Sequence, residues 1–176
     1  MNKTSDHDLL TDYAGGNDDA FSKFYQRHAS GLYAYLCSSL KDRFQAEEAM
    51  QAVFVNCLRS LDAVLGAANI KAYIYRIARN QVHAQIQPAL KSRSLPEGVL
   101  HMAQAPQEDA VARENMQCIE NVLSGLPHNQ RQVIVLHIYS SLTFREIAAA
   151  LGDNINTVMS RYQLGLKKIK EICREC

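Results

Sequence analysis

Apolar residues recur at helical spacing along most of the chain. In the segment QAEEAMQAVFVNCLRSL, Ala46, Ala49, Val53 and Cys57 belong to a stripe with the spacing i, i+3, i+4, i+7, which places them on one face of a helix. The same period predicts further helices over residues 6–16, 20–40, 70–86, 114–126, 127–142, 143–151 and 155–172. No segment alternates with period two for long enough to form a strand. The pattern therefore predicts an all-α protein.

The helical pattern is interrupted by one long stretch. Pro88, Pro96 and Pro106 fall within residues 88–106, where no amphipathic period is sustained. Proline lacks a backbone donor and breaks helix interiors. We therefore predict two small helical domains joined by a flexible linker: residues 1–94, a linker over 95–112, and residues 113–176.

The second domain carries a helix-turn-helix pattern. Thr143 and Glu146 have the spacing of a capping box, Gly152 suits the position after a helix, and Asn154 suits the N-cap of the next one. This arrangement places a recognition helix in the major groove of DNA. Small polar and cationic side chains near its start suit base and phosphate contacts: Asn154, Asn156, Thr157, Ser160, Arg161 and Lys167. A plain αα-hairpin with cations at its C-terminal end is the alternative.

Two features of the predicted recognition helix concern its apolar side chains. Four apolar residues are expected to pack against the supporting helix: Ile155, Val158, Tyr162 and Leu166. Met159 occupies a position where a DNA-reading helix is expected to carry a cation. Read alone, Met159 therefore argues against DNA binding.

Composition and charge narrow the class of protein. Hydrophobic residues make up 47% and charged residues 21%, as in folded proteins. No apolar run approaches the ~20 residues of a membrane span, and the N-terminus lacks a signal core, so we expect a cytoplasmic protein without membrane insertion. The net charge of +1 divides into −3 over 1–50, +5 over 51–94, −4 over 95–125 and +3 over 126–176. The basic blocks indicate two anion-facing surfaces, with ordinary solvated helix faces as the alternative.

The cysteines and histidines predict neither catalysis nor a metal site. Cys37 and Cys57 lie among apolar neighbours and are expected in the core. Cys173 and Cys176 form a Cys-x-x-Cys pair, but a structural zinc site needs four ligands and no second pair is present; a helix end is the alternative. We expect a protein that is not an enzyme and that holds no metal and no cofactor.

Several motifs, taken in order, resemble the extracytoplasmic-function (ECF) sigma factors of the sigma-70 family. DAFSKFYQRHASGLYAYL resembles the opening segment of that family, QAEEAMQAVFVNCLRSL its polymerase-clamp segment and AYIYRIARNQV its promoter-melting segment. LSGLPHNQRQVIVLHIYSSLTFREIAAALGDNINTVMSRYQLGLKKIKE is similar to its second conserved domain. The resemblance covers nearly the whole chain. It implies a transcription initiation factor that directs core RNA polymerase to promoter DNA and is restrained by an anti-sigma factor.

The resemblance also assigns residues to contacts. The helix docked on core polymerase would present Glu48, Gln51, Phe54 and Arg59. The minus-ten element would be held as flipped single-stranded bases by aromatic, amide and cationic side chains: Tyr73, Tyr75, Arg76, Arg79 and Asn80. Residues 60–71 would form the base-capturing loop. The minus-thirty-five element would lie as a duplex against the helix-turn-helix residues given above.

The chain departs from the family mainly by having fewer cations. QVHAQIQPALKSR follows YRIARN where the family has a basic run, Met159 replaces a frequent lysine, and QLGL replaces a basic stretch. The acidic residue after the clamp glutamine is Ala52 here. Fewer phosphate contacts weaken DNA binding. Two hypotheses stay open: a working sigma factor, or a sigma-like regulator that binds polymerase or a partner protein without reading a promoter. A stand-alone helix-turn-helix repressor would leave YRIARN unused.

Overall fold

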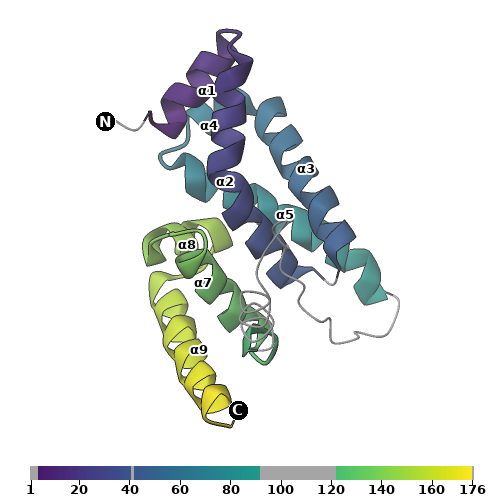
Figure 1. Cartoon of the computed structure of the whole chain (residues 1–176), viewed down its shortest axis with the longest axis vertical. Coiled ribbons are helices and arrows are strands. Elements are labelled where there is room, and N and C mark those ends of the chain that lie inside the picture. The colour runs from purple at the N-terminus through teal and green to yellow at the C-terminus, as the bar shows by residue number, and fades with distance from the viewer. Residues whose placement is uncertain (1–3, 41, 92–121, 176) are drawn as a thin grey trace, which may run out of the picture.

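The computed structural model describes residues 4–40, 42–91 and 122–175, and its regular elements in these ranges are all helices. The first group consists of α1 (Asp6–Ala14), α2 (Asp18–Ser39), α3 (Arg43–Arg59), α4 (Leu61–Leu65) and α5 (Ile70–Lys91). The second group consists of α7 (His128–Ile138), α8 (Phe144–Leu151) and α9 (Ile155–Glu175). The predicted all-α fold is confirmed, and the second group lies directly against the first (Figure 1).

Side-chain caps fix the start of several helices. Ser5 accepts a hydrogen bond from the Asp8 N–H at the start of α1, and Asp42 does the same for Gln45 at α3. The predicted capping box at α8 is present, with Thr143 and Glu146 as its two members. Gly152 ends α8 with a φ of 67°, a left-handed conformation that glycine adopts without steric cost. The helix-turn-helix therefore begins and ends where local chemistry predicts.

Three predicted boundaries are wrong. The expected loop over 60–71 contains α4, and α5 continues past Pro88 to Lys91, because a proline near a helix end removes few backbone hydrogen bonds. α7 ends at Ile138 rather than at 142, because Ser141 has a φ of 50° and the Leu142 N–H turns back to the Leu136 carbonyl at 3.1 Å. The linker over 95–112 and most of the helix over 114–126 lie outside the described residues.

One hydrophobic core extends through both groups. α5 packs against α8, and α2 packs against α7. Cys37 and Cys57 are buried in this core, as predicted. None of the helices in the described ranges is long and apolar enough to cross a membrane. We call the packing of the first group against the second the closed arrangement.

Candidate nucleic-acid interface

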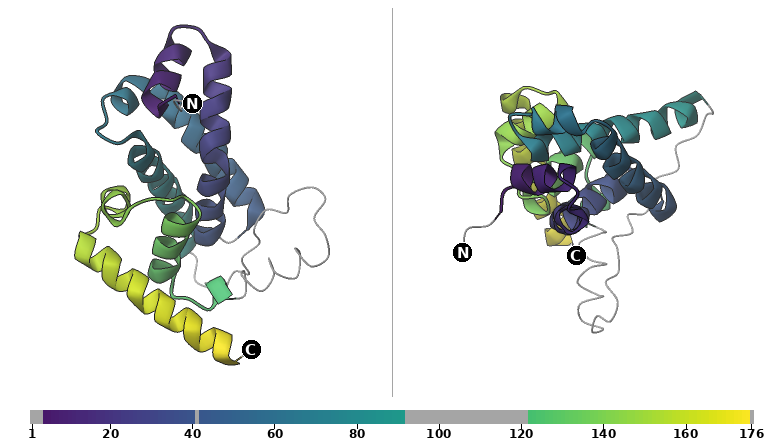
Figure 2. Two further views of the ribbon diagram at one scale, coloured as in Figure 1. Left: turned by 60° about the vertical axis from the view of Figure 1, so that its left-hand side comes forward. Right: turned by 90° about the horizontal axis from the view of Figure 1, so that it is seen from above.

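The recognition helix α9 presents a polar stripe to solvent. Asn156, Ser160, Gln163 and Lys167 are all exposed, and their spacing of i, i+4, i+7, i+11 places them along one side of the helix. α9 lies at the outer edge of the second group, on the side away from α1–α5 (Figure 2). Gln163 was not among the predicted contacts, although its helical spacing from Asn156 was readable from the sequence. The closed arrangement leaves this stripe accessible.

The opposite side of α9 packs closely on α7. Val158 and Gly165 are buried there. A Cβ on Gly165 would lie 2.5 Å from Cδ1 of the buried Ile134 and 3.4 Å from Cβ of Gln130. Only glycine lacks this atom. The glycine in QLGL, where the family has a basic stretch, thus allows the two helices to approach each other.

The other predicted contact residues of this motif differ in whether their side chains are free to reach DNA. Thr157 is exposed. The side chain of Asn154 accepts a hydrogen bond of 2.8 Å from the Asn156 N–H, so it caps the helix. Arg161 Nη1 donates to Asp153 Oδ2 at 2.5 Å, which neutralises the one cation predicted in the first two turns.

The expected packing of apolar residues on α9 is correct for Val158 and wrong for Ile155. Val158 is fully buried, whereas Ile155 is 38% exposed and Met159 is 40% exposed. Ile155 begins the helix at the edge of its buried face, where α8 has already ended at the turn. Two large apolar side chains therefore stand beside the polar stripe.

The predicted minus-ten residues divide between two sides of α5. Tyr73, Arg76 and Asn80 share one side by their spacing of i, i+3, i+7, and the Arg76 guanidinium lies 4.4 Å from the Tyr73 ring centroid. Arg76 and Asn80 are exposed, and Tyr73 is partly buried. This side combines an aromatic ring, a cation and an amide.

Tyr75 and Arg79 instead face the rest of the protein. Tyr75 is buried, and its ring centroid lies 5.8 Å from that of Tyr35. Burial raises the pKa of Tyr75 to about 12, with a hydrogen bond to Ser140 opposing the rise, so the phenol is neutral. Arg79 Nη1 lies 3.1 Å from the position of a Cβ on Gly152. The helix-turn-helix thus lies over this side of α5.

All four predicted polymerase-binding residues lie on α3, and three of them are exposed. Glu48, Gln51 and Arg59 are exposed. Phe54 is buried, and its ring centroid lies 4.6 Å from that of Tyr25, so it belongs to the core in this structure.

Two apolar residues extend the exposed side of α3. Phe44 is 75% exposed and Val55 is 45% exposed, and both align with Glu48 and Gln51 at i, i+4, i+7, i+11. These two residues were missed from the sequence, because an apolar residue on an amphipathic helix is expected on its buried face. We call Phe44, Glu48, Gln51, Val55 and Arg59 the α3 stripe.

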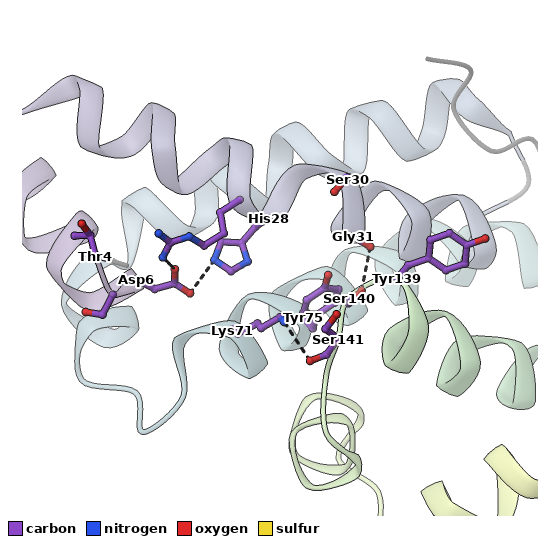
Figure 3. Close-up of a pocket in the computed structure, with 12 residues that line it drawn as sticks. Thr4, Asp6, His28, Ser30, Gly31, Lys71, Tyr75, Tyr139, Ser140 and Ser141 are labelled. Atoms are coloured by element: carbon purple, nitrogen blue, oxygen red, sulfur yellow. Dashed lines mark hydrogen bonds and ion pairs between the residues drawn. The ribbon is translucent and has the colours of Figure 1, made fainter. Parts of the chain in front are cut away.

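A cavity of about 480 Å³ lies between α1, α2, α5 and the turn before α8 (Figure 3). Asp6 accepts hydrogen bonds from Arg27 Nη1 at 2.6 Å and pairs with His28 Nε2 at 2.8 Å. Burial opposes these effects, yet His28 and Arg27 hold the pKa of Asp6 below its ordinary value. Lys71 Nζ donates to the Ser141 carbonyl at 3.4 Å. The polar groups here pair with one another and join the helices.

Comparison with known proteins follows the same division of the chain. The family model "Sigma-70 region 2" matches residues 24–87, and "Sigma-70, region 4" matches residues 116–169. RNA polymerase sigma factor SigZ of Bacillus subtilis is 26% identical over 159 residues, which are 90% of this chain and 88% of SigZ. ECF RNA polymerase sigma factor SigK of Mycobacterium ulcerans is 29% identical over 168 residues, which are 92% of this chain and 90% of SigK.

Two solved structures share the fold. CnrH in complex with the cytosolic domain of CnrY has a TM-score of 0.70 at 22% identity, covering 97% of both chains. The sigma factor RpoE in complex with the anti-sigma factor NepR, from Bartonella quintana, has a TM-score of 0.73 at 21% identity, covering 88% of this chain and 96% of RpoE.

The fold and the exposed sides of α3, α5 and α9 define a helical protein of two parts, the second of which contains a helix-turn-helix. The two family models match the chain in order and together span most of it. The chain belongs to the sigma-70 family of RNA polymerase sigma factors, and the resemblance to its ECF members is confirmed.

Proposed function

We propose that the chain is a working promoter-specificity subunit, which docks on core RNA polymerase in the cytoplasm, opens the minus-ten element and holds the minus-thirty-five element. It is a transcription initiation factor, and nucleotide polymerisation belongs to its partner. The observation that carries this proposal is the exposed side of α5, where Tyr73, Arg76 and Asn80 stand together.

This side of α5 suits single-stranded DNA. Separating base pairs costs unstacking energy, which aromatic stacking, amide contacts to base edges and cations along the backbone offset. Tyr73 supplies the ring, Asn80 the amide, and Arg76 the charge. Arg76 already lies over the Tyr73 ring, so both side chains are oriented before DNA arrives. A protein that bound only a partner would not need all three groups on one exposed side.

The α3 stripe suits docking on polymerase. Its two exposed apolar side chains, Phe44 and Val55, flank the polar pair Glu48 and Gln51. Exposed aromatic and aliphatic side chains beside polar groups are typical of surfaces at which proteins bind one another. The exposed polar stripe of α9 would contact duplex DNA in the major groove.

The closed arrangement opposes part of this function. Of the predicted minus-ten set, Arg79 lies against Gly152 of the helix-turn-helix, and the Tyr75 hydroxyl is hydrogen-bonded to Ser140 in the turn before α8, so the second group covers both. Promoter opening therefore requires the second group to move away from α5. An anti-sigma partner that favours the closed arrangement would hold the chain inactive; RpoE was solved with the anti-sigma factor NepR.

The test is transcription by core polymerase reconstituted with the full chain on genomic DNA, with start sites mapped. We expect discrete starts that Asn80→Ala weakens severely. The matched control is Asn17→Ala, because Asn17 is an exposed asparagine whose side chain makes no cap hydrogen bond; it should leave every start unchanged.

The sigma-like regulator without promoter reading remains the second candidate, since the chain has few cations after YRIARN. It predicts a complex with core polymerase that forms no open complex and that Asn80→Ala does not alter. Discrete starts that depend on Asn80 would exclude it. Equal transcription by wild type and Asn80→Ala would overturn the proposed promoter-specificity function.

A further inference from the structure

Two exposed apolar side chains stand within the DNA-facing part of α9. Ile155 is 38% exposed and Met159 is 40% exposed, and their spacing of i, i+4 places them side by side. α9 packs against α7 and α8, on the side of the second group that faces away from the first group (Figure 2). The packing of the described helices therefore leaves part of each side chain accessible.

The neighbours of Met159 on the helix surface are groups that read bases. Asn156 lies one turn before it, at i−3, and Gln163 one turn after it, at i+4; both are exposed. In the major groove, asparagine and glutamine recognise adenine, whereas apolar side chains contact the 5-methyl group of thymine. An amide and an apolar group on adjacent positions thus match the two halves of A·T pairs.

We propose that Met159, with Ile155 beside it, reads thymine methyl groups in the minus-thirty-five element; this inference rests on the proposed function. A lysine at this position would contact a phosphate, which adds affinity without sequence information. With methionine at this position, the phosphate contact is replaced by an apolar contact with a base. Met159, which taken alone argues against DNA binding, becomes a determinant of which promoter is chosen.

A contact with the 5-methyl group of thymine can be tested by removing that methyl group alone. Uracil pairs as thymine does and lacks only the 5-methyl group. The mapped promoter is prepared as a set of duplexes, each with one upstream thymine replaced by uracil. Binding of the holoenzyme to each duplex is measured by competition, with wild type and Met159→Ala compared.

For wild-type holoenzyme, uracil at one thymine should lower affinity about fourfold, the size expected for one methyl group withdrawn from apolar contact. Met159→Ala should lower affinity for the thymine duplex similarly and make the enzyme indifferent to uracil there. Met159→Leu should retain the discrimination. Uracil without effect at every thymine, or a uracil effect that persists in Met159→Ala, would overturn the inference.

Two controls separate this contact from other causes. Leu164→Ala removes another exposed apolar side chain of α9, 53% exposed and on the far side of the polar stripe, and should keep the uracil effect. Met159→Ala should leave the salt dependence of binding unchanged, whereas Met159→Lys should steepen its log–log slope by about 0.9, one phosphate contact. A holoenzyme with no start sites at all would overturn both this inference and the proposed function; start sites without uracil discrimination would overturn this inference alone.

Discussion

Asn69 Nδ2 donates a hydrogen bond of 2.7 Å to Glu146 Oε1, and this bond joins the first turns of α5 and α8 across 77 positions of sequence. The same Asn69 accepts the Ala72 N–H at 2.8 Å through Oδ1. Glu146 Oε2 in turn accepts the Thr143 N–H at 2.6 Å. The caps of two helices, one from each group, are thus a single hydrogen-bonded unit, and the closed arrangement depends on local helix chemistry.

Asn69→Asp should open the closed arrangement. The aspartate keeps the acceptor that caps α5, but it places a second carboxylate against Glu146 in place of the donor. We expect a loss of about 1–2 kcal/mol from the contact between the groups and a larger radius of gyration by small-angle scattering at neutral pH. Asn69→Ser is the control, since it retains a capping oxygen without charge. Scattering identical to wild type for Asn69→Asp would show that this contact does not hold the groups together.

Gly31→Ala should act as a wedge at the same interface. A Cβ on Gly31 would lie 2.9 Å from the Tyr75 hydroxyl oxygen and 3.2 Å from Ser140 Cα, and a backbone atom cannot rotate away. Overpacking of this kind typically costs about 1–3 kcal/mol. Transcription with core polymerase should rise at limiting polymerase, because the open form is populated in advance. Gly15→Ala, whose Cβ would meet only carbonyls of its own turn, should not raise transcription.

The contact between the groups should weaken in acid through Glu146. Burial opposes the shift, yet hydrogen bonds from Thr143 and Asn69 and the charge of Lys71 hold the pKa of Glu146 below its ordinary value of 4.5. A depressed pKa contributes stability that is complete above the unfolded value and is lost as pH falls through the folded one. Thermal unfolding should therefore show a loss below about pH 4.5 that is smaller in Glu146→Gln. Equal pH profiles for the two proteins would contradict this assignment.

The residues that were predicted correctly are those whose role is local. Thr143, Glu146 and Gly152 act within one turn of chain, so their order in the sequence specifies the cap and the turn. Tyr75 and Phe54 are buried in the closed arrangement, which the sequence did not indicate, because a side chain on an amphipathic helix becomes core or surface according to what packs there. α5 is covered by α3 on one side and by α8 on another, and periodicity shows only that a helix has a buried face.

The ion pair of Arg161 could not be predicted from the sequence either. Its partner Asp153 lies eight positions earlier, within the turn between α8 and α9, so no spacing rule for helix pairs reveals the contact. Phe44 and Val55 show the reverse case, because both are apolar and yet exposed, and the helical period alone did not draw attention to them. The all-α fold class followed from pattern and resemblance, whereas the accessible residues could be identified only from the packing of the helices.

Gly165 should tolerate no branched side chain. A Cβ there lies 2.5 Å from Ile134 Cδ1, and Ile134 is buried and cannot move without disturbing the core between α7 and α9. For Gly165→Val we expect a loss of more than about 2 kcal/mol in the free energy of unfolding. Gly165→Ala should lose less, because helix propensity returns about 1 kcal/mol. Urea denaturation of the two variants measures the difference, and a Gly165→Val protein as stable as wild type would contradict the close packing of the helices.

Asp153→Asn should strengthen promoter binding by releasing a cation that is already in place. Arg161 Nη1 is held by Asp153 Oδ2 at 2.5 Å, and the two side chains are 25% and 29% exposed. Without the carboxylate, Arg161 is available to a phosphate beside the recognition helix. The log–log salt slope of holoenzyme binding should steepen by about 0.9, the value for one added phosphate contact. Asp153→Asn/Arg161→Gln should cancel the gain, and an unchanged slope in Asp153→Asn alone would show that Arg161 does not reach DNA.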